Sequence, residues 1–144
     1  RPFSSVEEMD ETIIQNWNKT VGKEDTVVFA GDFALYPKEK TAELVNRLNG
    51  HKIIILGNHD RKHDVQWWRD VGFEEVSRFP IVFQEFYIVS HEPLYMNESM
   101  PYVNVHGHIH GLKYEGNKHI NICVEHWNYT PIPFETIAQI AAGK

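Results

Sequence analysis

The 144-residue sequence has little cysteine, no run of basic residues and no long apolar stretch. Its one cysteine, Cys123, excludes an internal disulfide, and the apolar surroundings INICVE predict a buried strand residue instead of a thiolate nucleophile. No stretch reaches the roughly 20 apolar residues that a membrane-spanning helix requires. Lysine and arginine are scattered, and the formal net charge of -6 disfavours an extended nucleic-acid surface. We therefore expect a cytoplasmic protein that binds neither a membrane nor long nucleic acids.

Repeats, low-complexity segments and interdomain linkers are also lacking, so we expect one domain over residues 1–144. Apolar residues at helical spacing predict helices over 4–22, 37–50, 62–71 and 134–142, the first of them with a capping box. Short apolar runs predict strands over 25–30, 52–56, 76–82, 86–89, 103–111 and 119–125, with a hairpin through 113–119. The order strand, helix, strand over 25–57 implies a parallel crossover, so the fold class is α/β.

Four of the apolar runs end in polar loops, which read Gly31-Asp32, Gly57-Asn58-His59-Asp60, Ser90-His91 and Gly107-His108-Ile109-His110. Ligands of α/β sheets bind beyond the carboxyl ends of the strands, so these loops are expected to converge. Carboxylate, amide and imidazole donors suit Mn, Fe, Zn or Ni. A carboxylate that can bridge, together with several imidazoles, indicates a two-metal centre.

These four blocks resemble, in residue type and order, those of the calcineurin-like metallophosphoesterases. The segments RPF, NWN and WNYTPI look like those of the small single-domain phage and bacterial members. The resemblance implies a β-sandwich flanked by helices, in the layer order α/β/β/α. It also implies a metal-dependent phosphoesterase that acts on a small phosphorylated substrate, nucleotides included.

The metal ligands that the resemblance implies belong to two sites that share one carboxylate. Asp32 would bridge two divalent ions, with Mn favoured over Fe, Zn or Ni. Asn58, His91 and His108 would complete one site, and His110 would serve the other.

The catalytic groups that the resemblance implies follow Asn58 directly. His59 would protonate the leaving oxygen or stabilise the transition state, and Asp60 would orient the ring of His59. The reaction would be in-line attack on the phosphorus of a phosphomonoester or phosphodiester by a metal-bound hydroxide. The sequence has no P-loop pattern, so the metals would hold the phosphoryl oxygens.

The family's first motif, Asp-X-His at the end of its first strand, is missing before Gly31. Neither Asp10 nor Asp25 is followed by a histidine two residues later. We therefore expect an N-terminally incomplete domain without its first strand. The chain should bind one ion well and a second ion weakly, because the second site keeps only Asp32 and His110.

Two other functions remain open. A metallophosphoesterase-like scaffold would fit the missing motif, although His59 and Asp60 speak against it. A histidine-triad nucleotide hydrolase would use His106, His108 and His110 without a metal, but it would leave the other blocks unexplained. In the phosphoesterase interpretation, His106 lies outside the ligand set, near the site or in its pocket. The remaining residues singled out are aromatics expected in the core or as surface cover, Trp67, Trp68, Trp127 and Tyr129, and histidines expected at the surface, His51, His63, His119 and His126.

Overall fold

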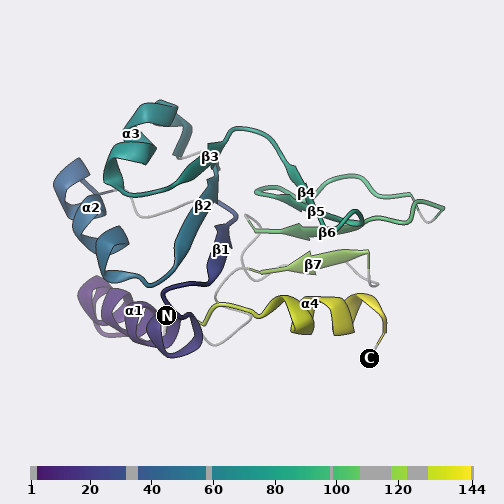
Figure 1. The fold of residues 1–144 in the computed structure, drawn as a ribbon, viewed down its shortest axis with the longest axis horizontal. Coiled ribbons are helices and arrows are strands. Elements are labelled where there is room, and N and C mark those ends of the chain that lie inside the picture. The colour runs from purple at the N-terminus through teal and green to yellow at the C-terminus, as the bar shows by residue number, and fades with distance from the viewer. Residues whose placement is uncertain are drawn as a thin grey trace.

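The computed structural model describes residues 3–31, 36–57, 60–97, 99–107, 118–122 and 130–143. In these ranges two β-sheets lie side by side and are flanked by helices (Figure 1). The helices are α1 (Val6–Thr20), α2 (Lys38–Arg47), α3 (Val65–Val71) and α4 (Phe134–Ala141), with a short 3-10 turn at Asp60–Lys62. The strands are β1 (Thr26–Phe29), β2 (His51–Ile55), β3 (Glu75–Ser77), β4 (Ile81–Phe83), β5 (Tyr87–Ser90), β6 (Val103–His106) and β7 (His119–Asn121). None of the helices in these ranges is long and apolar enough to span a membrane.

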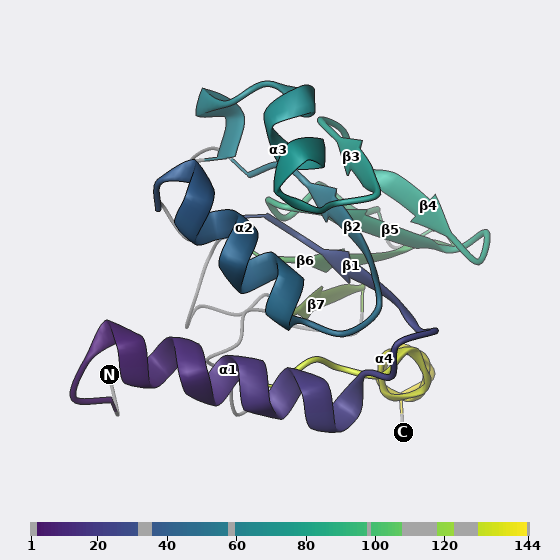
Figure 2. The same ribbon diagram turned by 60° about the vertical axis from the view of Figure 1, so that its left-hand side comes forward.

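The first sheet has the order β1-β2-β3 and is entirely parallel. Helices α1, α2 and α3 lie along one of its faces (Figures 1 and 2). Because side chains alternate along a strand, Ile54 and Leu56 pack against these helices, whereas Ile55 packs toward the second sheet. The predicted parallel crossover between β1 and β2 is confirmed.

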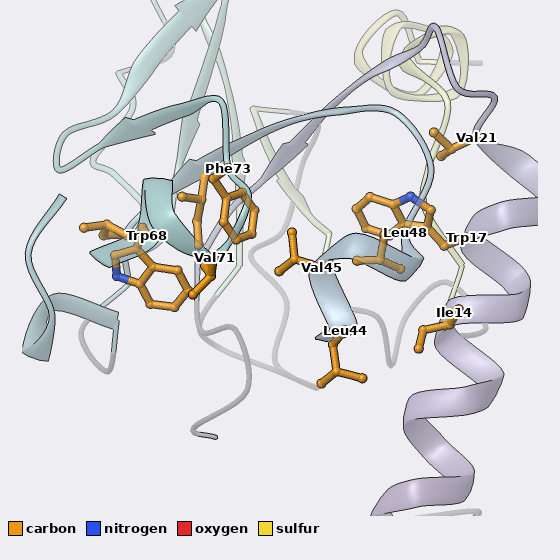
Figure 3. Close-up of a cluster of buried hydrophobic side chains, with 11 residues drawn as sticks. Ile14, Trp17, Val21, Leu44, Val45, Leu48, Trp68, Val71 and Phe73 are labelled. Atoms are coloured by element: carbon orange, nitrogen blue, oxygen red, sulfur yellow. The ribbon is translucent and has the colours of Figure 1, made fainter. Parts of the chain in front are cut away.

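The helices and the first sheet enclose a cluster of buried apolar side chains (Figure 3). Helix α1 begins at the predicted cap, where the Ser5 hydroxyl accepts a hydrogen bond from the Glu8 N–H at 3.0 Å. Trp68 is fully buried in the cluster and Trp67 packs against it, so the prediction that these two are packing residues is confirmed. The members from the helices and from the residues just after them are Ile14, Trp17, Val21, Leu44, Val45, Leu48, Trp68, Val71 and Phe73. Four other residues singled out in the sequence lie outside the described ranges; they are Cys123, His126, Trp127 and Tyr129.

The second sheet has the order β4-β5-β6-β7, in which β4 is antiparallel to β5 and the other pairs are parallel. Helix α4 runs beside β7 (Figure 1). A second apolar cluster joins Ile55 of the first sheet, Val89 and Val105 of the second sheet, and Ile137 of α4. The predicted β-sandwich flanked by helices is therefore confirmed.

The predicted single strand over 76–82 is wrong, because the chain changes sheets within it. Strand β3 ends at Ser77 in the first sheet, and β4 begins at Ile81 in the second. The Ser77 hydroxyl accepts from the Phe79 N–H at 3.1 Å and donates to the Phe79 carbonyl at 2.7 Å, which turns the backbone. Pro80 has no N–H with which to continue a ladder.

The hairpin predicted through 113–119 does not join the two strands on either side of it. Strands β6 and β7 pair in parallel, with Asn104 opposite His119, and a tight hairpin turn can connect only antiparallel strands. Residues 113–117 themselves lie outside the described ranges. An antiparallel hairpin instead joins β4 to β5 through Gln84 and Glu85, which have φ values of 52° and 66°.

Candidate metal centre

The carboxyl ends of strands from both sheets meet at one place. Gly31 follows β1, Gly57 follows β2, His91 follows β5 and Gly107 follows β6. A Cβ atom on Gly31 would lie only 2.6 Å from His91 Nδ1 and 2.7 Å from the Gly57 nitrogen. The Gly107 N–H donates to the His91 carbonyl at 2.9 Å. These contacts bring together the four loops that were expected to converge.

His91 is held in one orientation at this meeting point. Its side chain is only 3% exposed, and its Nδ1 lies 2.9 Å from the Ala30 carbonyl oxygen. A carbonyl oxygen can only accept, so Nδ1 donates this hydrogen bond, and a metal could be bound only through Nε2. Metal-binding histidines typically donate their other ring nitrogen to such an oxygen. Ligation of a metal by His91 Nε2 would be compatible with this hydrogen bond and stays a prediction.

Asp60 anchors the loop that starts at Gly57. Its side chain is fully buried, and its Oδ2 accepts from the Gly57 N–H at 2.9 Å. The N–H groups of Asp60 and Arg61 both donate to the Gly57 carbonyl, at 3.1 and 3.2 Å. The Trp68 indole N–H donates to the Asp60 carbonyl at 3.0 Å and so ties the loop to α3. Orientation of His59 by Asp60 stays a prediction.

The other predicted ligands and the predicted acid lie outside the described residues; they are Asp32, Asn58, His59, His108 and His110. Asp32, Asn58 and His108 each directly follow one of the converging glycines. Within the ranges that the structure describes, no group of three or more His, Cys, Asp or Glu side chains could hold a metal ion. The described part of the candidate centre is thus its framework and one of the predicted ligands, His91.

Of the three histidines His106, His108 and His110, His106 is the one that the structure describes. His106 is fully buried, with Nδ1 3.1 Å from the Gly107 carbonyl oxygen. Its ring lies edge-on to that of His119, with the centroids 5.9 Å apart. His106 thus lies beside the centre, in the segment that leads to His108.

His119 was predicted at the surface, and this is wrong. It belongs to β7, is only partly exposed, and donates from Nε2 to the Leu94 carbonyl at 2.6 Å. Sequence reasoning also missed Asn104, a fully buried amide in β6. The signal was available, because Asn104 is a polar residue between Val103 and Val105 in a strand that is buried throughout.

Comparison with known proteins places this framework in a family. The model of the calcineurin-like phosphoesterases matches residues 2–138. The chain belongs to the calcineurin-like phosphoesterase family. Membership implies a metal-dependent hydrolase, and the two sheets flanked by helices agree with the fold of these phosphoesterases.

Two proteins and one solved structure are similar to this chain. The chain is 33% identical over 149 residues to uncharacterized protein MJ1445 of Methanocaldococcus jannaschii, which covers 97% of this chain and 79% of that protein. It is 38% identical over 61 residues to the Gene 66 protein of Mycobacterium phage L5, over 40% of this chain and 30% of the phage protein. The crystal structure of the protein of unknown function AQ665 from Aquifex aeolicus matches with a TM-score of 0.71 at 23% identity, over 96% of this chain and 88% of that one. The phage relative fits the phage and bacterial type, and the structural match shows a shared fold.

Proposed function

We propose that the chain is a divalent-metal-dependent phosphoesterase that hydrolyses a small phosphorylated substrate, a monoester or a diester, with nucleotides among the candidates. The observation that carries this proposal is the close approach of Gly31, Gly57 and Gly107 to one another or to His91, whose imidazole is held by the Ala30 carbonyl. Each of these glycines leads directly into a residue with a metal-binding side chain. Mn²⁺ is proposed as the preferred metal and the cytoplasm as the location of the protein.

The donor set fits a cation of intermediate hardness, because it combines a carboxylate with an amide oxygen and imidazoles. In the proposal, Asp32 would supply a carboxylate to both metal positions. Asn58, His91 and His108 would complete one position, and His110 would serve the other. Divalent ions bound there would offset the charge of the phosphoryl oxygens and lower the pKa of water.

His59 and Asp60 have the two remaining roles in the proposal. His59 is proposed to donate a proton to the leaving oxygen, a role that requires its protonated imidazole before the bond breaks. Asp60 holds the loop that presents His59, through its hydrogen bond with the Gly57 N–H. The hydrogen bond between Asp60 and Gly57 joins the residues on the two sides of the Asn58-His59 pair, which would favour catalysis by positioning.

Metal stoichiometry is the first test. After dialysis against Mn²⁺, elemental analysis of the wild type should find at least one ion per chain, and Asp32→Asn should lower that number. Asp25→Asn is the matched control, because Asp25 lies before β1 and Asp32 lies after it. The amide oxygen that this control introduces can still accept from the Gly22 N–H, as the Asp25 carboxylate does at 2.8 Å. Equal metal content in all three proteins would contradict the proposed site.

Hydrolysis is the second test. With Mn²⁺, the chain should hydrolyse p-nitrophenyl phosphate or bis(p-nitrophenyl) phosphate, and EDTA should abolish the reaction. His59→Asn should lower kcat by about 10²-fold or more, with the Mn²⁺ content unchanged. Bound Mn²⁺ without hydrolysis would favour the scaffold interpretation. Hydrolysis that resists EDTA, with a phosphohistidine adduct, would favour the histidine-triad interpretation.

A further inference from the structure

The outward face of the second sheet carries buried polar side chains. Val103 and Val105 of β6 point into the apolar cluster between the sheets, so Asn104 points to the opposite face. Asn104 is nevertheless 0% exposed, and Ser90 at the end of β5 is 2% exposed. Buried amides and hydroxyls are costly unless they are hydrogen-bonded, so their partners indicate what they do.

The partners of Asn104 are two successive parts of the chain around His91. Its Nδ2 donates to the Ile88 carbonyl at 3.0 Å and to the Ser90 hydroxyl at 2.9 Å, both in β5. Its Oδ1 accepts from the Leu94 N–H at 2.8 Å, in the loop that follows β5. One side chain thus fixes the backbone on both sides of His91.

The same loop is held at two further points. His119 of β7 donates to the Leu94 carbonyl at 2.6 Å, so side chains from the sheet satisfy both backbone groups of Leu94. The Ser90 hydroxyl donates to the Glu92 carbonyl at 2.6 Å. The turn from Ser90 to Leu94 is therefore tied to β6 and β7, and His91 lies inside that turn.

We propose that Asn104 is a positioning residue that keeps His91 in its metal-binding orientation by tying the Ser90–Leu94 turn to the second sheet. The proposal rests on the proposed function, because it assumes that His91 binds a metal. Removing the amide would leave the Leu94 N–H and the Ser90 hydroxyl without their Asn104 partner on β6. The turn would then move, and the imidazole would leave the Ala30 carbonyl more often.

The experiment compares Asn104→Ala with Val105→Ala. The two residues are neighbours in β6, but Val105 faces the apolar cluster and does not hold the turn. Hydrogen exchange without metal should show faster exchange of the Leu94 amide in Asn104→Ala, on the order of tenfold, and little change in Val105→Ala. The Kd for Mn²⁺, measured by calorimetry, should rise about tenfold in Asn104→Ala and much less in Val105→Ala.

Each outcome separates this inference from the proposed function. A wild type that binds no Mn²⁺ overturns the proposed function itself. A wild type that binds Mn²⁺, with equal Kd changes in the two variants, overturns only the role of Asn104. If Asn104→Ala does not fold, His119→Ala provides the second variant, because it removes the hydrogen bond to the Leu94 carbonyl and leaves the Asn104 amide in place. His119→Ala should also raise the Kd for Mn²⁺, by a smaller factor than Asn104→Ala. An unchanged Kd would contradict the proposal.

Discussion

Gly31 lies in close contact with the ends of two neighbouring strands. Its φ is 98°, and a Cβ atom there would meet both His91 Nδ1 and the Gly57 nitrogen at less than 3.0 Å. A side chain at this position would therefore add backbone strain and would also push the strand ends apart. The tight meeting of β1, β2 and β5 thus requires glycine at position 31.

Gly31→Ala should lower the free energy of unfolding by about 3 kcal/mol, because strain and overpacking add. Gly143→Ala is the control, since Gly143 has a φ of 80° but a Cβ atom there would meet nothing within 4 Å. Urea denaturation gives the unfolding free energy of each variant. The difference between the two losses is the cost of placing a Cβ atom against His91 and Gly57, apart from the cost of a positive φ at alanine. Equal losses would show that the contacts with His91 and Gly57 are unimportant.

Asp60 offers a second test at the scale of one residue. Asp60→Ala removes the acceptor of the buried Gly57 N–H and should cost about 2 kcal/mol of unfolding free energy. Asp60→Asn keeps an acceptor oxygen of the same shape and should cost clearly less. Urea denaturation measures both. If the two variants lose the same stability, the loop depends on the carboxylate charge and not on the hydrogen bond.

An ion pair joins the start of β2 to the residue before β3. His51 Nδ1 lies 2.8 Å from Glu74 Oε1, and the hydrogen bond to this carboxylate raises the pKa of His51. A raised pKa in the folded state means that the pair stabilises the fold fully below the ordinary His pKa of about 6.5. The contribution disappears as the pH rises through the higher folded pKa.

Glu74→Gln should therefore lower the melting temperature slightly at pH 5.5 and not at pH 9. The effect is small because both side chains are largely exposed to solvent. Glu75→Gln, the same change of charge one residue later, is the control. A loss of equal size at both pH values would show that His51 ionisation is not involved.

The elements that were predicted well are those with local causes. The cap and the apolar spacing that predict helix α1 lie within one segment of the sequence. Short apolar runs predict β1 and β2, and apolar residues at helical spacing predict α2. The two errors concern partners far along the chain. The sequence around Pro80 cannot show that β3 and β4 join different sheets, and the parallel pairing of β6 with β7 depends on the whole sheet.

In the candidate site, too, features with a local signal were predicted and features that depend on distant partners were not. Polar residues after apolar runs predicted His91 and Asp60, because a strand end is visible in the sequence. The roles of Asn104 and His119 were missed because both side chains bond to the backbone of Leu94, 10 and 25 residues away in the chain. No local pattern reports a hydrogen bond of this kind.

At the scale of the whole molecule, the first sheet lies between two apolar clusters. The helices α1 to α3 supply one cluster, and the second sheet with α4 supplies the other. Ile54 and Ile55 are adjacent in β2 and contribute to different clusters. The first sheet is therefore packed on both of its faces, and neighbouring residues of β2 belong to different layers.

Within the described residues, the chain passes from the first sheet to the second through the exposed segment Arg78–Pro80. Every described strand of one sheet precedes this segment, and every described strand of the other follows it. Two fragments that divide the chain at this segment should therefore associate with each other. Fragments 1–78 and 79–144, produced from separate genes with an affinity tag on one, should purify together. A break between Arg47 and Leu48 would instead separate β1 from β2 within one sheet, and those fragments should not reassemble.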